Sequence, residues 1–178
     1  MKLQYYLSLS DFLEYQLYTS SKSQLHKKKR FRSRVSIPIL YFLIGLFLSY
    51  QNNDITIVFV FSIVSILWFL FYPVYSKWRY KKYFFKYIKE NYKNRINKEV
   101  ELIFKGNHIY GKDVSSETKI NSSEIKELIE IKSHFFIKFK TDISLIIPKH
   151  CIQNQEEFKK IFSDLKVGYI NEITWKWK

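Results

Sequence analysis

The chain has 178 residues, a formal net charge of +14 and one cysteine. A single cysteine excludes an internal disulfide bond, and the length leaves room for one small soluble domain beside any membrane segment. The positive charge is concentrated in two short segments, which argues against an extended nucleic-acid-binding surface.

Residues 1–21 are predicted to form a strand followed by a short helix. Apolar side chains at the odd positions from Leu3 to Leu9 alternate with mainly polar ones, which is the period of a half-buried strand. Ser10 and Asp11 then begin a segment with the acidic first turn that is typical of a helix start. We expect a linker over residues 19–24. The opening stretch is too short and too polar for the apolar region of a cleaved signal peptide.

Two uncharged runs, residues 35–53 and residues 55–76, are separated only by Asp54. As helices they would reach about 28 and 33 Å, at a rise of about 1.5 Å per residue. The apolar core of a bilayer is about 30 Å thick. We therefore predict a transmembrane hairpin of two helices joined by a very short turn.

Basic segments border both runs on the same side of this hairpin. Residues 22–34 carry seven Lys and Arg and no acid, residues 77–98 carry nine against Glu90, and the turn has no basic residue. Because Lys and Arg beside a span stay cytoplasmic, we predict a multi-pass inner-membrane protein with both termini in the cytoplasm. Anionic lipids at the cytoplasmic face are the expected partners. The candidate residues of this basic belt are Lys27, Lys28, Lys29, Arg30, Arg32, Arg34, Lys77, Arg79, Lys81 and Lys82.

Residues 77–98 are predicted to form a basic amphipathic helix. Aromatic and aliphatic side chains recur at three- and four-residue spacing from Tyr80 to Ile96, and most lysines lie off this stripe. Two interpretations stay open. The stripe enters the headgroup region of the membrane, or it packs on a cytoplasmic domain as part of a stalk.

Residues 99–178 are predicted to form a small cytoplasmic antiparallel β domain with a C-terminal helix. Alternating apolar positions and turn signals give five or six strands, with a tight hairpin at Thr141-Asp142. Residues 155–165 are the expected helix, and the tail that follows is either a further strand or an interfacial anchor. The N-terminal strand is expected to join this sheet, so the fold class is an α+β membrane protein.

The sequence indicates no catalytic, cofactor-binding or metal-binding site. The four histidines lack metal-ligand spacing, and His150 and Cys151 would point to opposite faces of a strand. The glycines are isolated, which excludes a phosphate-binding loop, and neither span contains an ionisable side chain. We expect a protein that is not an enzyme and uses no cofactor. A homo-oligomeric pore stays open as an alternative.

The order of the segments carries a family resemblance. The opening strand, the run DFLEYQLY at residues 11–18, the basic segment and two spans come first, followed by Glu124-Ile125-Lys126-Glu127, Phe135-Phe136-Ile137, Ile146-Ile147-Pro148-Lys149 and a helix from Phe158 to Phe162. In this order they resemble the YcxB-like family of bacterial membrane proteins over nearly the whole chain. The resemblance implies a pleckstrin-homology-like (PH-like) cytoplasmic domain, and it implies no established activity. Ser122 departs from the pattern, because many relatives carry Trp there.

We expect a non-enzymatic binding or scaffold protein whose cytoplasmic domain takes a partner protein or an anionic lipid headgroup. Two alternatives stay open: an accessory subunit of a transporter or membrane enzyme, and an immunity protein against a toxin. A homo-oligomer is compatible with each of them. Nucleic acid is not an expected partner.

Overall fold

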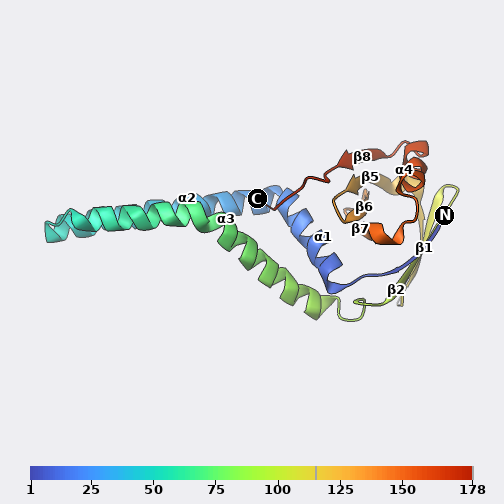
Figure 1. Ribbon diagram of the computed structural model, residues 1–178, viewed down its shortest axis with the longest axis horizontal. Helices are drawn as coiled ribbons and strands as arrows, with labels where there is room; N and C mark the ends of the chain where they lie inside the picture. The colour runs from blue at the N-terminus through green and yellow to red at the C-terminus, as the bar shows by residue number, and fades with distance from the viewer. Residues whose placement is uncertain (115, 178) are drawn as a thin grey trace. The chain divides into compact units, whose positions relative to one another are not determined.

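The structure is a computed structural model that describes residues 1–114 and 116–177 (Figure 1). The chain divides into two compact units. The first contains Met1–Tyr15 and Phe85–Lys176, and the second contains Gln16–Phe84 and Trp177. The class is α+β, with two long apolar helices and antiparallel strand pairs, and the predicted class is confirmed at this level. Lys178, the end of the predicted tail, lies outside the described residues.

Two long helices dominate the second unit. Helix α2 spans Gln24–Asn52 and helix α3 spans Thr56–Asn91, and both are long and apolar enough to cross a membrane. Asn53 ends α2 in the left-handed conformation, with φ of 51°, and the Asp54 carboxylate accepts a hydrogen bond of 2.8 Å from the Thr56 amide. The turn is therefore built from residues that suit a helix end and a helix start.

The helices are longer and more continuous than the sequence pattern predicts. Helix α1 covers Leu9–Lys22, and only Ser23 separates it from α2, so the expected linker over residues 19–24 is wrong. The Ser23 hydroxyl accepts a hydrogen bond from the His26 amide and caps α2. The amphipathic helix expected over residues 77–98 is the second half of α3, and it ends at Asn91.

Helices α2 and α3 pack closely within the hairpin. Gly45 is buried, and a Cβ atom placed on it would lie 2.6 Å from the Cβ of Phe61. The Ser65 hydroxyl lies 3.1 Å from the Pro38 carbonyl oxygen on the other helix and 2.8 Å from the Phe61 oxygen on its own. The small residue and the shared hydroxyl allow the two backbones to approach.

The first unit contains two four-stranded sheets. One has the order β1-β2-β3-β4, and all its neighbours pair antiparallel. Its strands are β1 (Lys2–Tyr6), β2 (Glu99–Lys105), β3 (His108–Lys112) and β4 (Glu117–Asn121). The pairing of β1 with β2 joins the first residues of the chain to those that follow α3.

The second sheet has the order β7-β6-β5-β8. Its strands are β5 (Ile125–Glu130), β6 (His134–Phe139), β7 (Ser144–Pro148) and β8 (Gly168–Asn171). Strand β8 pairs parallel with β5, so the expectation of a purely antiparallel domain is wrong for this strand. Helix α4 (Gln155–Asp164) precedes β8, and the short helices η1 (Ser122–Glu124) and η2 (Lys149–Cys151) complete the unit.

Aromatic side chains form the core of this unit. Phe158 and Phe162 of α4 are buried, and both rings meet Phe104 of β2 edge-on at 5.8 and 5.9 Å. Phe135 of β6 lies 5.0 Å from Phe158. Tyr5 of β1 is 4% exposed and donates its hydroxyl to the Ile146 carbonyl oxygen at 2.9 Å. The N-terminal strand is thus anchored in the same core as α4 and β6.

Candidate anion-binding site

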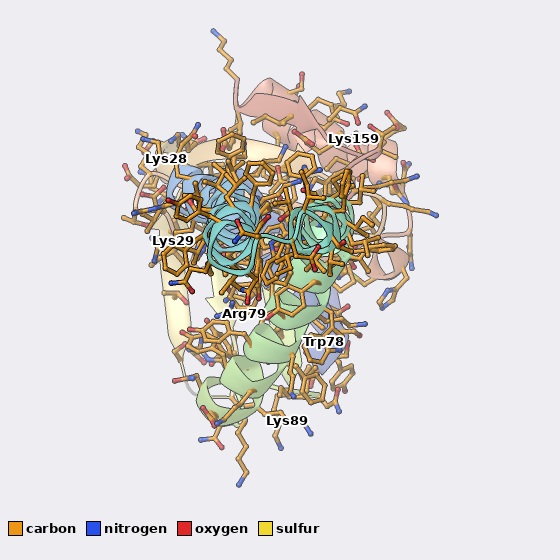
Figure 2. The ribbon with its side chains drawn as sticks, turned by 90° about the vertical axis from the view of Figure 1, so that its left-hand side faces the viewer. Lys28, Lys29, Trp78, Arg79, Lys89 and Lys159 are labelled. Carbon is orange, nitrogen blue, oxygen red and sulfur yellow. The ribbon has the colours of Figure 1, made fainter. Side chains whose placement is uncertain are left out.

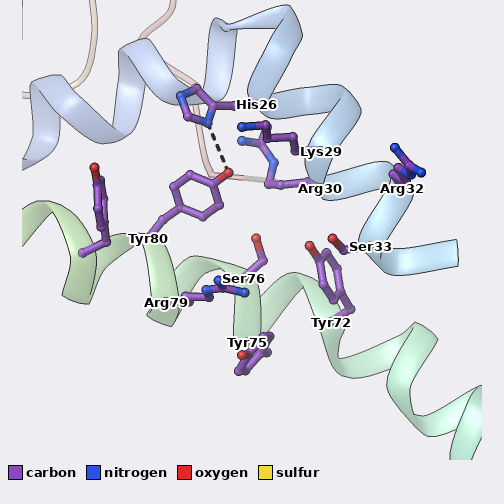
Figure 3. A pocket seen from close by; sticks show the side chains of 11 residues that line it. His26, Lys29, Arg30, Arg32, Ser33, Tyr72, Tyr75, Ser76, Arg79 and Tyr80 are labelled. Carbon is purple, nitrogen blue, oxygen red and sulfur yellow. Dashed lines mark hydrogen bonds between the residues drawn. The ribbon is translucent and has the colours of Figure 1, made fainter. Parts of the chain in front are cut away.

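A cavity of about 470 Å³ lies between the first turns of α2 and the middle of α3, entirely within the second unit (Figure 3). The residues that line it follow helical spacing on both helices, so each helix presents one face to the other. The lining residues are His26, Lys29, Arg30, Arg32 and Ser33 from α2, and Tyr72, Tyr75, Ser76, Arg79, Tyr80 and Tyr83 from α3.

The charge of this cavity is entirely positive. Lys29, Arg30, Arg32 and Arg79 contribute four cations, and the lining residues include no Asp or Glu. Lys29, Arg32 and Arg79 are exposed and Arg30 is half-buried, and cations gathered along one partly open cavity raise the local concentration of anions. Guanidinium groups also bind phosphate and carboxylate oxygens in a two-point geometry. The chemistry therefore favours an anion, and the four tyrosines supply apolar walls with polar tips.

Arg30 is held in place by its neighbours. Its guanidinium lies 4.8 Å from the ring centre of Trp177 and 5.7 Å from that of Tyr80, and it donates to the Ser20 carbonyl oxygen at 3.4 Å. The Tyr80 hydroxyl is 3.2 Å from Nδ1 of His26 (Figure 3). These contacts make Arg30 a preorganised wall of the cavity.

The other three cations have no acidic partner. Within residues 1–114 and 116–177, no carboxylate forms an ion pair with Lys29, Arg32 or Arg79. Ser76 is 3% exposed, and its hydroxyl has no hydrogen-bond partner among the residues that the structure describes. In Figure 3 this hydroxyl points from α3 toward α2. Buried polar groups are normally paired, so an unpaired hydroxyl beside unpaired cations indicates a place for a polar ligand.

The structure brings together only part of the predicted basic belt. Four of the candidates line the cavity, whereas Arg34 is bound to α3: its Nε donates to the Phe69 carbonyl oxygen at 3.1 Å. Lys82 lies 5.2 Å from the Trp78 ring. The remaining candidates also lie outside the cavity and are exposed: Lys27, Lys28, Lys77 and Lys81. Figure 2, which looks along the two helices, shows Lys28 and Lys29 on α2 and Trp78 and Arg79 on α3.

The sequence pattern does not identify the polar residues that complete the cavity. It gives no role to His26, Ser33 or Ser76, and it leaves the aromatic stripe that begins at Tyr80 either in the headgroup region or packed on a cytoplasmic domain. Their spacing in the sequence could have identified the lining residues of α3. These residues recur at intervals of three and four, which places polar and aromatic groups on one face of the helix: Tyr72, Tyr75, Ser76, Arg79, Tyr80 and Tyr83.

A buried histidine forms a separate polar cluster in the first unit. His134 is 3% exposed, and its Nε2 lies 3.0 Å from an Asp11 carboxylate oxygen. Its Nδ1 lies 3.4 Å from Glu14 and 2.9 Å from the Ser133 hydroxyl, which donates to Glu14. The Ser133 hydroxyl donates its proton to the Glu14 carboxylate. The cluster therefore serves as a structural contact between α1 and β6.

A buried glutamate forms a second cluster in the same unit. Glu130 is 2% exposed and contacts Lys149 at 2.5 Å, Lys159 at 3.3 Å and the Tyr169 hydroxyl. Burial acts to raise the pKa of Glu130, but the hydrogen bonds from Lys149 and Tyr169 outweigh it and lower that pKa. Burial and the adjacent carboxylate raise the pKa of Tyr169 to about 12. The cluster links β5 to α4 and β8. Among the described residues, no group of three His, Cys, Asp or Glu could hold a metal ion.

Part of the chain matches the model of a known protein family. The model of the family described as YcxB-like protein matches residues 105–162. This segment runs from the end of β2 to Phe162 in α4, about a third of the chain, and the predicted resemblance is confirmed there. No curated protein and no solved structure matches the chain.

Proposed function

We propose that this protein is a two-pass protein of the bacterial inner membrane that binds anionic lipid headgroups at its cytoplasmic face and performs no catalysis. One observation carries the proposal. A cavity with four cations and no acid lies where two long apolar helices become polar. The distribution of Lys and Arg supports an orientation with both termini in the cytoplasm.

The position of the cavity suits a lipid better than a soluble anion. Tyr72 and Tyr75 belong to the end of the second uncharged run, and Lys29, Arg30 and Arg32 precede the first. A headgroup among these cations would leave its acyl chains beside the apolar surface of the hairpin. Each basic residue near an anionic membrane surface contributes about 1 kcal/mol to such binding.

The first unit supplies a second element of the proposal. Its two sheets and α4 are the parts expected of a PH-like module, and the family match covers most of this module. We propose that it serves as a cytoplasmic scaffold for a partner protein. Strand β1 belongs to it although the whole hairpin separates β1 from β2, so the scaffold and the hairpin are built from one interleaved chain.

Lipid binding by the purified full chain tests the proposal. The chain is reconstituted in nanodiscs of phosphatidylcholine with or without an anionic phospholipid, and bound lipid is measured by native mass spectrometry. A variant with Lys29, Arg30, Arg32 and Arg79 changed to Gln is compared with one in which Lys27, Lys28, Lys77 and Lys81 are changed to Gln. We expect the first variant to lose much more anionic lipid than the second, because only the first removes the cations that line the cavity. Equal losses would assign the binding to net charge and remove the cavity from the proposal.

Cysteine labelling tests the orientation. In a Cys151→Ser background, Asn52→Cys places a thiol at the end of α2, beside the α2–α3 turn, and Lys132→Cys places one in the exposed turn between β5 and β6. A membrane-impermeant maleimide added to cells with a permeable outer envelope should label the first and spare the second. The opposite pattern would reverse the proposed topology.

A further inference from the structure

We infer that the α2/α3 cavity selects a phospholipid whose headgroup carries two negative charges, either as one phosphomonoester or as two phosphodiesters. The inference rests on the proposed function and specifies its ligand class. Four observations carry it: the number of unpaired cations, the fixed position of Arg30, the unpaired buried hydroxyl and the volume of the cavity.

The cations set the charge of the ligand. Lys29, Arg32 and Arg79 have no acidic partner in the described part of the chain, and Arg30 is oriented by Tyr80 and Trp177. A phosphodiester brings one negative charge, and a phosphomonoester brings about 1.5 to 2 at pH 7. These three cations are exposed, so solvent weakens their mutual repulsion, but they line one cavity, and a second negative charge offsets more of their positive charge than one does.

Ser76 indicates where a phosphate oxygen would lie. Its hydroxyl is a buried donor without an acceptor, and it lines the same cavity as the three cations. A phosphate oxygen is a strong acceptor and would pair this donor. Because the hydroxyl is unpaired, its removal should not lower the stability of the lipid-free protein.

The size of the cavity fits a headgroup. Its volume of about 470 Å³ lies in the range of small-molecule sites, which is roughly 300 to 1,000 Å³. A phosphate group with its glycerol occupies only part of such a space. The cavity therefore has room for a second phosphate as well as for the arginine side chains that would hold it.

The test measures the preference of the full chain among four lipids. Nanodiscs of phosphatidylcholine receive the same molar fraction of additional phosphatidylcholine, phosphatidylglycerol, phosphatidic acid or diphosphatidylglycerol, and bound lipid is counted by native mass spectrometry. Phosphatidic acid and diphosphatidylglycerol should bind at least about fivefold more tightly than phosphatidylglycerol, which corresponds to about one additional ion pair near the surface.

Variants locate the preference in the cavity. Ser76→Ala should weaken phosphatidic acid binding about fivefold and leave the unfolding temperature of the lipid-free chain unchanged or higher. Ser36→Ala, an exposed serine of α2, is the matched control and should change neither quantity. If Ser76→Ala unfolds, Arg79→Gln replaces it, with the exposed Lys81→Gln as its control. An Arg79→Gln chain that retains the full preference overturns the inference.

The other outcomes separate the inference from the proposed function. If phosphatidylglycerol binds as tightly as the two dianionic lipids and still requires the cavity cations, the inference is wrong and headgroup binding stands. If no anionic lipid binds better than phosphatidylcholine, both are wrong. If glycerol 3-phosphate or inorganic phosphate displaces all bound phosphatidic acid at equal concentration, the site takes a soluble dianion, and the lipid as its source is overturned.

Discussion

The Nε of Arg34 donates a hydrogen bond of 3.1 Å to the carbonyl oxygen of Phe69, and its guanidinium lies 4.2 Å from the Phe69 ring centre. Phe69 is four residues before Pro73, the proline inside α3. In an uninterrupted helix the amide of residue 73 would donate to that oxygen, but proline has no N–H. Arg34 of α2 thus supplies the hydrogen-bond donor that α3 lacks at Pro73. Because its guanidinium is bound to α3, Arg34 is not one of the cations that line the cavity.

Substitution of Arg34 should therefore depend on Pro73. We expect Arg34→Gln to lower the free energy of unfolding by about 1 to 3 kcal/mol, because a hydrogen bond from a charged donor is lost. In a Pro73→Ala background the helix regains its own donor, and the same substitution should cost less than half as much. Thermal unfolding of the four chains of this double-mutant cycle, in one detergent, measures the coupling.

Arg32→Gln is the matched control for this cycle. It removes the same charge two residues away, and Arg32 has no contact with Phe69 among the described residues. Its cost should be small and the same in both backgrounds. If Arg34→Gln lowers the free energy of unfolding equally with and without Pro73, Arg34 does not replace the missing Pro73 donor at the Phe69 carbonyl oxygen.

The close approach at Gly45 gives a second prediction. A Cβ atom there would lie 2.6 Å from the Cβ of Phe61, so Gly45→Ala should force α2 and α3 apart. We expect a net loss of about 1 to 3 kcal/mol, although alanine favours helix by about 1 kcal/mol over glycine. Thermal unfolding in detergent measures the change. In a Phe61→Gly background the added methyl group should cost nothing, and a stabilised Gly45→Ala chain would show that the helices do not pack here.

The α+β class and the two long apolar helices could be predicted because both depend on the local composition of the sequence. The absence of charge over residues 35–53 and 55–76 and the alternation over residues 99–105 each need only a short window of sequence. The parallel pairing of β8 with β5 could not be predicted, because the period of a strand does not specify its neighbour. The serines of the expected linker lie in or beside helices instead: Ser21 lies in α1 and donates its hydroxyl to the Tyr18 carbonyl oxygen, and Ser23 caps α2.

The site was predictable as a set of charges but not as an arrangement. The cluster of Lys and Arg before the first apolar run identifies Lys29, Arg30 and Arg32 as candidates. The cluster does not show which of these side chains point toward α3, because their orientation depends on how α2 packs on α3 at Gly45 and Phe61. Ser76 carries no sequence signal of its own. Its significance comes from burial without a partner, which is a property of the packed structure.

His134 makes the stability of the first unit depend on pH. Burial acts to lower the pKa of His134, but the hydrogen bonds to Asp11 and Glu14 outweigh it and raise that pKa above 6.5. Burial acts to raise the pKa of Asp11, and the hydrogen bonds with His134 and Ser8 outweigh it and lower that pKa. The pKa of Glu14 is lowered mainly by its hydrogen bond with His134.

The direction in which stability changes with pH follows from these three pKa shifts. Because the folded-state pKa of His134 is raised, its contribution is complete below pH 6.5 and is lost as pH rises through the folded-state pKa. The contributions of Asp11 and Glu14 are present above their ordinary values of 3.8 and 4.5 and are lost as pH falls. The free energy that the cluster contributes should therefore be greatest between about pH 4.5 and 6.5.

Chemical unfolding of the full chain in detergent at pH 5.5, 7.0 and 8.5 tests this dependence, with intrinsic fluorescence as the readout. The wild-type chain should lose stability from pH 5.5 to 8.5, because the charged histidine that pairs with two carboxylates is neutralised. His134→Gln should be less stable at pH 5.5 and should lose much less over the same range. His108→Gln, in β3 and outside the cluster, should keep the wild-type decline. Parallel pH profiles for wild type and His134→Gln would show that another group controls the decline, because the expected decline comes from the pairing of His134 with Asp11 and Glu14.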